Sequence, residues 1–114
     1  MSRLYKKKNI LITGGTGFLG KSIIRKIDKF KFNVTLVTRN KISGFNNIVV
    51  KDFFTLPKKK YIKLLTNQDI VLHLAWYAKP GKYYNSKKNY KCLKGSKEFV
   101  SACKSTSIKK FIGI

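Results

Sequence analysis

Short apolar runs alternate with amphipathic stretches along this chain, which is the pattern of an α/β protein. Apolar or β-branched runs predict strands over residues 9–13, 33–38, 48–50, 69–75 and 109–114. Apolar positions at helical spacing predict helices over 21–30, after Pro57 and over about 86–104, with a loop over 76–86. Strands this apolar suit a parallel sheet that is buried on both faces.

Three sets of apolar side chains should face the core from the predicted helices. They are Ile23, Ile24, Ile27 and Phe30 in the first helix, Tyr61, Leu64 and Leu65 in the second, and Tyr90, Leu93, Phe99, Val100 and Cys103 in the third. A chain of 114 residues that is 43% apolar has room for one domain with a core of its own.

Composition excludes several classes of protein. No apolar run approaches the roughly 18 residues that span a bilayer, and glycines at 14, 15, 17 and 20 interrupt the apolar run that follows the charged start. Cys92, Cys103 and the single histidine, His73, supply neither a disulfide framework nor a set of metal ligands. We therefore expect a cytoplasmic protein that holds no metal and contacts no membrane.

The charge is strongly positive, with 26 Lys and Arg against 4 Asp and Glu and a net charge of +22. Clustered cations attract nucleic acid because they neutralise phosphates. Here the lysines are spread over the whole chain, and only Arg3, Arg25 and Arg39 could form the arginine forks that base readout favours. The distribution therefore disfavours a dedicated nucleic-acid surface, while the charge should attract any anionic ligand.

A glycine-rich segment, Thr13-Gly-Gly-Thr-Gly-Phe-Leu-Gly20, lies between the first predicted strand and the first predicted helix. In that context it is a dinucleotide-binding fingerprint. Gly14 allows the tight turn, Gly17 lets a pyrophosphate approach the backbone, and Gly20 lets the helix lie close to the sheet. The amides of Phe18 and Leu19 should point at the phosphates, where the helix dipole also favours an anion.

With this motif the sequence resembles the extended short-chain dehydrogenases/reductases, the NAD(P)-dependent epimerases and dehydratases of nucleotide sugars. Other matching pieces are Asp52, Asp69-Ile-Val-Leu-His-Leu-Ala75, Gly95-Ser96 and Ile108-Lys-Lys-Phe-Ile112. The resemblance implies a Rossmann-type doubly wound parallel sheet of strand order 3-2-1-4-5, with residues 1–114 as the dinucleotide-binding domain. One departure is Cys92, at a position where many members of the family have Asn.

The resemblance also implies roles for individual residues. Asp52 would accept a hydrogen bond from the adenine amine, and Leu74 and Ala75 would line the adenosine ribose. His73 has no local partner for catalysis, so we interpret it as a packed core residue.

The end of the second predicted strand bears on the choice of cofactor. Members that bind NAD place an acid there to hold the ribose hydroxyls, whereas this chain has Thr38 followed by Arg39. A guanidinium can bind a 2′-phosphate through two hydrogen bonds. The sequence therefore favours NADP(H) over NAD(H).

Catalytic residues are expected to be absent. In the family, a Ser or Thr and a Tyr-x-x-x-Lys pair lie beyond the fifth strand, and this sequence stops within that strand. With so many lysines, three such pairs occur by chance before it, namely Tyr83/Lys87, Tyr84/Lys88 and Tyr90/Lys94. We expect a fold truncated after its fifth strand that binds cofactor without catalysing.

Three interpretations remain open at this point. The chain is the cofactor-binding part of a nucleotide-sugar epimerase, dehydratase or reductase; or a nonenzymatic basic module for nucleotides or nucleic acid; or an inactive truncated remnant. The last strand would present Phe111, Ile112 and Ile114 on an open sheet edge, which could pair with a separate C-terminal chain or a second copy.

Overall fold

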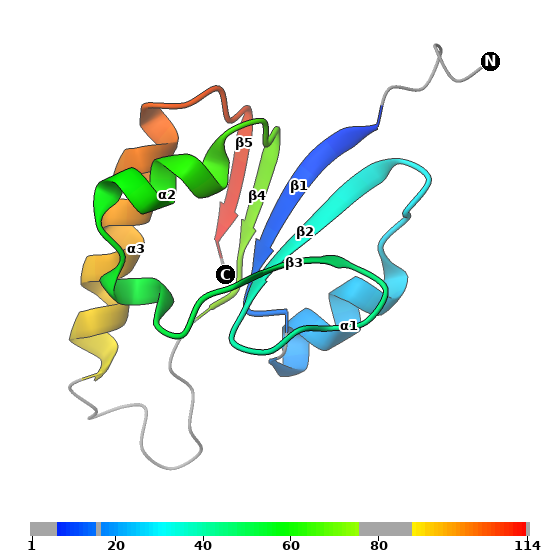
Figure 1. Ribbon diagram of the computed structural model, residues 1–114, viewed down its shortest axis with the longest axis horizontal. Helices are drawn as coiled ribbons and strands as arrows, with labels where there is room; N and C mark the ends of the chain where they lie inside the picture. Colours follow the sequence, from blue (N-terminus) through cyan, green and yellow to red (C-terminus); the bar gives the residue numbers. More distant parts are fainter. Residues whose placement is uncertain (1–6, 16, 76–87, 114) are drawn as a thin grey trace.

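The chain forms one five-stranded parallel sheet in a computed structural model that describes residues 7–15, 17–75 and 88–113 (Figure 1). The strands are β1 (Lys8–Thr13), β2 (Phe32–Thr38), β3 (Asn46–Val49), β4 (Ile70–His73) and β5 (Lys110–Gly113). Their order across the sheet is β3-β2-β1-β4-β5, and every neighbouring pair is parallel. The predicted fold class and strand order are confirmed.

Helices cover both faces of this sheet. Figure 1 shows α1 (Phe18–Lys26) on one side, and α2 (Lys58–Leu65) with α3 (Lys88–Lys104) on the other. A short 3-10 helix, η2 (Phe53–Thr55), which the sequence did not predict, packs with α2 and α3. No helix in the described part of the chain is long and apolar enough to cross a membrane.

The central strand β1 contributes to two separate cores because successive side chains of a strand point to opposite faces. Leu11 packs with the side chains of η2, α2 and α3, among them Phe53, Tyr61 and Phe99. Ile10 and Ile12 belong to the other core, beside α1. The sheet is therefore buried on both sides, as the continuous apolar runs indicated.

The first helix differs from its predicted range of 21–30. It begins at Phe18 and ends at Lys26, and the Ile27 N–H makes its last backbone hydrogen bond, to the Ile23 carbonyl. The chain then turns at Asp28, whose carboxylate accepts from the Phe30 N–H at 2.8 Å. Phe30 is 89% exposed, so its assignment to the apolar face was wrong.

The buried face of α3 also differs from the prediction. Phe99 and Cys103 are buried as expected, but Tyr90 is 76% exposed and Leu93 and Val100 are exposed too. The buried face instead runs through Cys92, Gly95, Phe99 and Ala102, and its centre rests on η2 at Gly95. Because a glycine contributes no apolar side chain, the pattern of apolar letters alone could not identify this face.

Replacing Gly95 with alanine should destabilise the fold. A Cβ there would lie 2.5 Å from the Phe54 carbonyl oxygen and 2.6 Å from the Phe54 Cα. Helix propensity favours alanine by about 1 kcal/mol, but overpacking against backbone costs about 1–3 kcal/mol. We expect Gly95→Ala to lower the free energy of unfolding in urea, while the exposed control Lys97→Ala stays near the unaltered value. Equal or greater stability of Gly95→Ala would contradict this packing.

Candidate functional site

A cavity of about 400 Å³ opens where the carboxyl ends of the strands meet η2 and α3. Seven of the ten residues proposed from the sequence line it: Gly14, Gly17, Thr38, Arg39, Asp52, Leu74 and Ala75. The other three, Phe18, Leu19 and Gly20, lie in the first turn of α1, and Leu19 and Gly20 do not line the cavity. Crevices of this kind, at the carboxyl ends of parallel strands, are where open α/β sheets bind ligands.

The turn after β1 passes unusually close to the chain that follows β4. Gly14 has a φ of +78°, and a Cβ there would lie 2.6 Å from the Ala75 nitrogen and the Leu74 carbonyl carbon. The Gly17 N–H closes the turn by donating to the Gly14 carbonyl at 3.1 Å. Gly20 in turn packs α1 against the same loop, since a Cβ there would overlap the Gly14 carbonyl. Gly14 and Gly20 are therefore required by the packing of the chain itself.

Gly17 has no such internal requirement. Its φ of −75° suits any residue, and among the described residues a Cβ there would meet only the Gly14 oxygen, at an ordinary 3.5 Å. It is the N-cap of α1, and no side chain of a described residue makes a capping hydrogen bond at that helix end. The absent side chain leaves space in the cavity beside uncapped helix amides, which is the arrangement that binds a phosphate.

A buried polar network lies beneath the cavity. The Thr13 Oγ1 accepts hydrogen bonds from the Leu74 and Ala75 N–H groups at 3.1 and 3.2 Å, and its own hydrogen is directed to His73 Nδ1 at 2.7 Å. His73 Nε2 then carries the ring proton and donates to Ser96 Oγ at 2.9 Å. Thr13 and His73 thus join β1, β4 and α3.

His73 is 6% exposed and packs among aromatic rings, including Phe99 at 5.3 Å between ring centroids and Phe111 at 5.9 Å. Burial lowers the pKa of the imidazole to about 4, so the ring is neutral at physiological pH. The structure agrees with a packed core histidine.

The charged groups of the cavity are mostly positive. Asp52 forms an ion pair with Lys91 of α3, and the hydrogen bond from Lys91 is the main cause that lowers the pKa of its carboxyl. This is the one ion pair between described residues, so Arg39 and Lys51 line the cavity without a carboxylate partner there. The cavity should therefore attract an anion.

Thr38 adds a polar group that lacks a partner. It ends β2 at the cavity and is 5% exposed, and its Oγ1 makes no hydrogen bond within the described structure. A buried hydroxyl without a partner costs free energy, so such groups are uncommon in folded proteins.

Sequence reasoning missed half of the cavity lining. The missed residues are Val37, Val50, Lys51, Phe53, Phe54, Lys91 and Cys92. Lys51 adjoins Asp52 and could have been included with it. Lys91 carried no signal, because its place at the cavity depends on which face of α3 is buried.

The fold and the glycine loop together define a Rossmann-type α/β domain with a ligand cavity at the carboxyl ends of its strands. Residues 10–114 match the NAD dependent epimerase/dehydratase family. The chain belongs to that family.

Individual relatives agree with this assignment. The chain is 28% identical over 96 residues to dTDP-6-deoxy-L-talose 4-dehydrogenase (NAD(+)) of Aggregatibacter actinomycetemcomitans, an alignment that covers 75% of this chain and 35% of the relative. Among solved structures, UDP-N-acetylglucosamine 4-epimerase from Bacillus cereus has a TM-score of 0.74 at 25% identity, covering 94% of this chain and 35% of that one.

A more distant structure shares the fold. A variant of uronate dehydrogenase from Agrobacterium tumefaciens, complexed with NAD, has a TM-score of 0.70 at 14% identity and covers 95% of this chain and 40% of its own. The chain thus spans between a third and a half of the length of these relatives.

The neutral state of His73 makes stability depend on pH. The unfolded chain takes up the imidazole proton near the ordinary pKa of 6.5 and the folded chain only near 4. The free energy of unfolding therefore has its full value above pH 6.5. It falls by about 3 kcal/mol in total as the pH is lowered from 6.5 toward 4. Urea unfolding between pH 7 and pH 5 should show this slope, and His73→Gln should flatten it.

Because His73 is the one histidine in the sequence, its ring resonance provides a direct second measurement. In NMR spectra of the folded chain, this resonance should stay constant between pH 8 and pH 5.5. A titration midpoint near the ordinary histidine value would contradict the buried network.

Proposed function

We propose that this chain binds a nicotinamide dinucleotide across the carboxyl ends of its strands and serves as the cofactor-binding part of a nucleotide-sugar epimerase, dehydratase or reductase. The observation that carries the proposal is Gly17, a glycine that the packing of the described residues does not require and that leaves space beside the N-terminal end of α1. The unpartnered Thr38 hydroxyl and the family membership support it.

Each part of the site has a task in this proposal. The loop from Gly14 to Gly17 and the first turn of α1, with the Phe18 and Leu19 amides, bind the pyrophosphate. Asp52 accepts from the adenine amine at one end of the cavity, and Leu74 and Ala75 line the path of the ribose. When bound, the nicotinamide supplies hydride transfer, and the residues of this chain hold and orient the cofactor.

We further propose that residues 1–114 act as one binding domain that does not catalyse on its own. Of the three Tyr-x-x-x-Lys pairs, Tyr90/Lys94 lies on the exposed side of α3 and neither residue lines the cavity. Tyr83/Lys87 and the tyrosine of Tyr84/Lys88 lie outside the described residues. The acid and base of the reaction would then come from another part of the enzyme.

An aspartate at position 17 should weaken cofactor binding without weakening the fold. Aspartate is a favoured N-cap, so Gly17→Asp should preserve or slightly raise the free energy of unfolding. The same carboxylate would repel a pyrophosphate, so calorimetry should show dinucleotide affinity falling by roughly a hundredfold or more.

Ser107→Asp is the matched control, since it makes the same change of charge at an exposed position before β5, at the opposite end of the sheet. It should leave affinity within about twofold of the unaltered chain. Unchanged binding by Gly17→Asp would show that no phosphate binds at this helix end and would refute the proposal.

We also propose that the cofactor is NADP(H) rather than NAD(H). Arg39 and Lys51 line the cavity without carboxylate partners among the described residues, and Thr38, whose hydroxyl has no partner among them, lines it too. A 2′-phosphate would satisfy the hydroxyl and pair with the guanidinium, whereas NAD would leave both cations unmatched.

Removing Arg39 should therefore abolish the preference between the two cofactors. We expect the unaltered chain to bind NADP+ about tenfold more tightly than NAD+, the factor that one charged hydrogen bond supplies. Arg39→Ala should bring the ratio near one by weakening NADP+ alone. The exposed neighbour Lys41 does not line the cavity, so Lys41→Ala should keep the ratio. An unchanged ratio in Arg39→Ala would contradict the assignment.

A further inference from the structure

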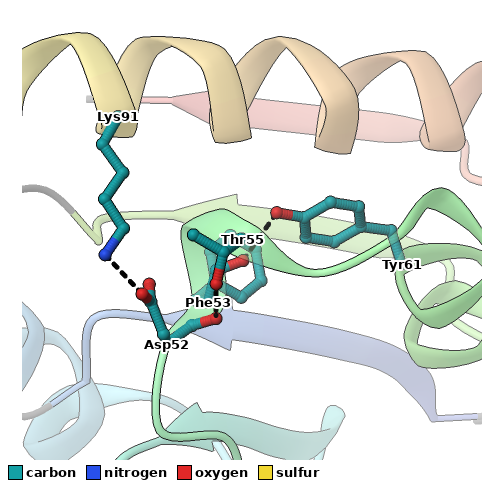
Figure 2. A network of polar contacts seen from close by, with 5 residues as sticks. All are labelled: Asp52, Phe53, Thr55, Tyr61 and Lys91. Atoms are coloured by element: carbon teal, nitrogen blue, oxygen red, sulfur yellow. Dashed lines mark hydrogen bonds and ion pairs between the residues drawn. The ribbon is translucent and has the colours of Figure 1, made fainter.

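The backbone at Asp52 is held rigidly by the elements around it (Figure 2). The Tyr61 hydroxyl of α2 donates to the Phe53 carbonyl at 2.6 Å, and burial raises the pKa of Tyr61 to about 12, so this donor stays protonated. The Phe53 ring packs edge-to-face against Tyr61 and Phe99, with ring centroids 5.3 and 4.9 Å apart. These contacts fix Phe53, the residue next to Asp52, which leaves the side-chain torsions of Asp52 to be considered.

Those torsions are restrained chiefly from α3, and also within η2, where the Thr55 side chain and the Phe54 backbone hydrogen-bond to the same carboxylate. Figure 2 shows Lys91 extending from this helix to the Asp52 carboxylate, and the ion pair is made by Oδ2. One turn further along, Gly95 lies directly on the backbone of Phe54, so the helix that carries Lys91 is itself fixed relative to η2. Both partners line the cavity and are roughly half exposed, at 46% for Lys91 and 41% for Asp52.

A carboxylate has about four acceptor sites, so one bound to a lysine can still accept from a ligand. The lysine restricts rotation of the carboxylate about its side-chain torsions. A fixed carboxylate at the base end of the cavity can distinguish a purine that has an amine at its six-position from one that has an oxygen there. A carboxylate free to rotate could instead accept from the ring N1–H of the six-oxo purine.

We propose that Lys91 is a positioning residue that holds Asp52 in the orientation for a six-amino purine and so makes the site selective for adenine dinucleotides. This inference rests on the proposed function, because it assigns Asp52 to the base of the bound cofactor. It concerns base selectivity, which is separate from the preference for a 2′-phosphate assigned to Arg39.

The test compares two ligands that differ only at the six-position of the base. Calorimetry on the full chain would measure NADP+ and its six-oxo analogue, nicotinamide hypoxanthine dinucleotide phosphate. The unaltered chain should bind the six-oxo form about tenfold more weakly. In Lys91→Gln that ratio should fall to roughly threefold or less, because NADP+ binds more weakly while the released carboxylate accommodates the analogue.

Two further variants separate positioning from charge. Lys91→Arg retains a cation that can pair with Asp52 and should retain the ratio. Lys94→Gln removes the same charge from an exposed site on the same helix that does not line the cavity, so it should weaken both ligands alike and leave the ratio unchanged.

An unchanged ratio in Lys91→Gln, or an equal fall of the ratio in Lys94→Gln, would overturn the inference. If the unaltered chain bound neither dinucleotide, the proposed function would fail and this inference with it. Binding of both dinucleotides with a ratio that does not depend on Lys91 would overturn the inference alone.

Discussion

The Thr13 hydroxyl is the interaction on which the geometry of this site depends. Two backbone N–H groups, from Leu74 and Ala75, donate to the same oxygen, and the hydroxyl proton goes to His73. These bonds hold the chain leaving β4 against the end of β1, where Gly14 passes too close for any Cβ. Because His73 continues the network to Ser96, α3 is held at the same place. The cavity forms above this junction.

Most of the fold could be predicted from sequence because the strands are apolar on both faces and a glycine loop follows the first of them. The strand order came from the family resemblance, since periodicity does not say which parallel strands are neighbours. The end of β4 could not be predicted from the local sequence. Leu74 and Ala75 belong to the apolar run predicted as strand. The Leu74 N–H still donates to the Thr13 carbonyl, but the Ala75 N–H donates to the Thr13 hydroxyl instead, and the strand ends at His73. The end of β4 therefore depends on the tertiary position of Thr13, which the local sequence does not give.

The candidate site was predicted from two sources. Thr38 and Arg39 came from the end of the second predicted strand, and Asp52, Leu74 and Ala75 came from the family resemblance; all five line the cavity. The contribution of α3 was missed because this helix carries apolar residues on more than one face. Its contact with η2 is made at Gly95, which is invisible to a search for apolar periodicity. Without that contact, Lys91 is indistinguishable from the many solvent-exposed lysines of the chain.

The residues of the cavity fall into two groups with different physical requirements. Gly14 and the aromatic residue Phe53 are tightly packed or buried, and the fold requires them whether or not a ligand binds. Gly17, Arg39 and Lys51 are exposed, and no packing or ion pair inside the described structure accounts for them. Glycine is an acceptable N-cap, so stability alone neither requires nor excludes Gly17, whereas a buried hydroxyl such as that of Thr38 is unfavourable when it is left without a partner. Both features sit on one cavity with an excess of positive charge, and an anionic ligand bearing hydroxyl or phosphate groups accounts for all of them together.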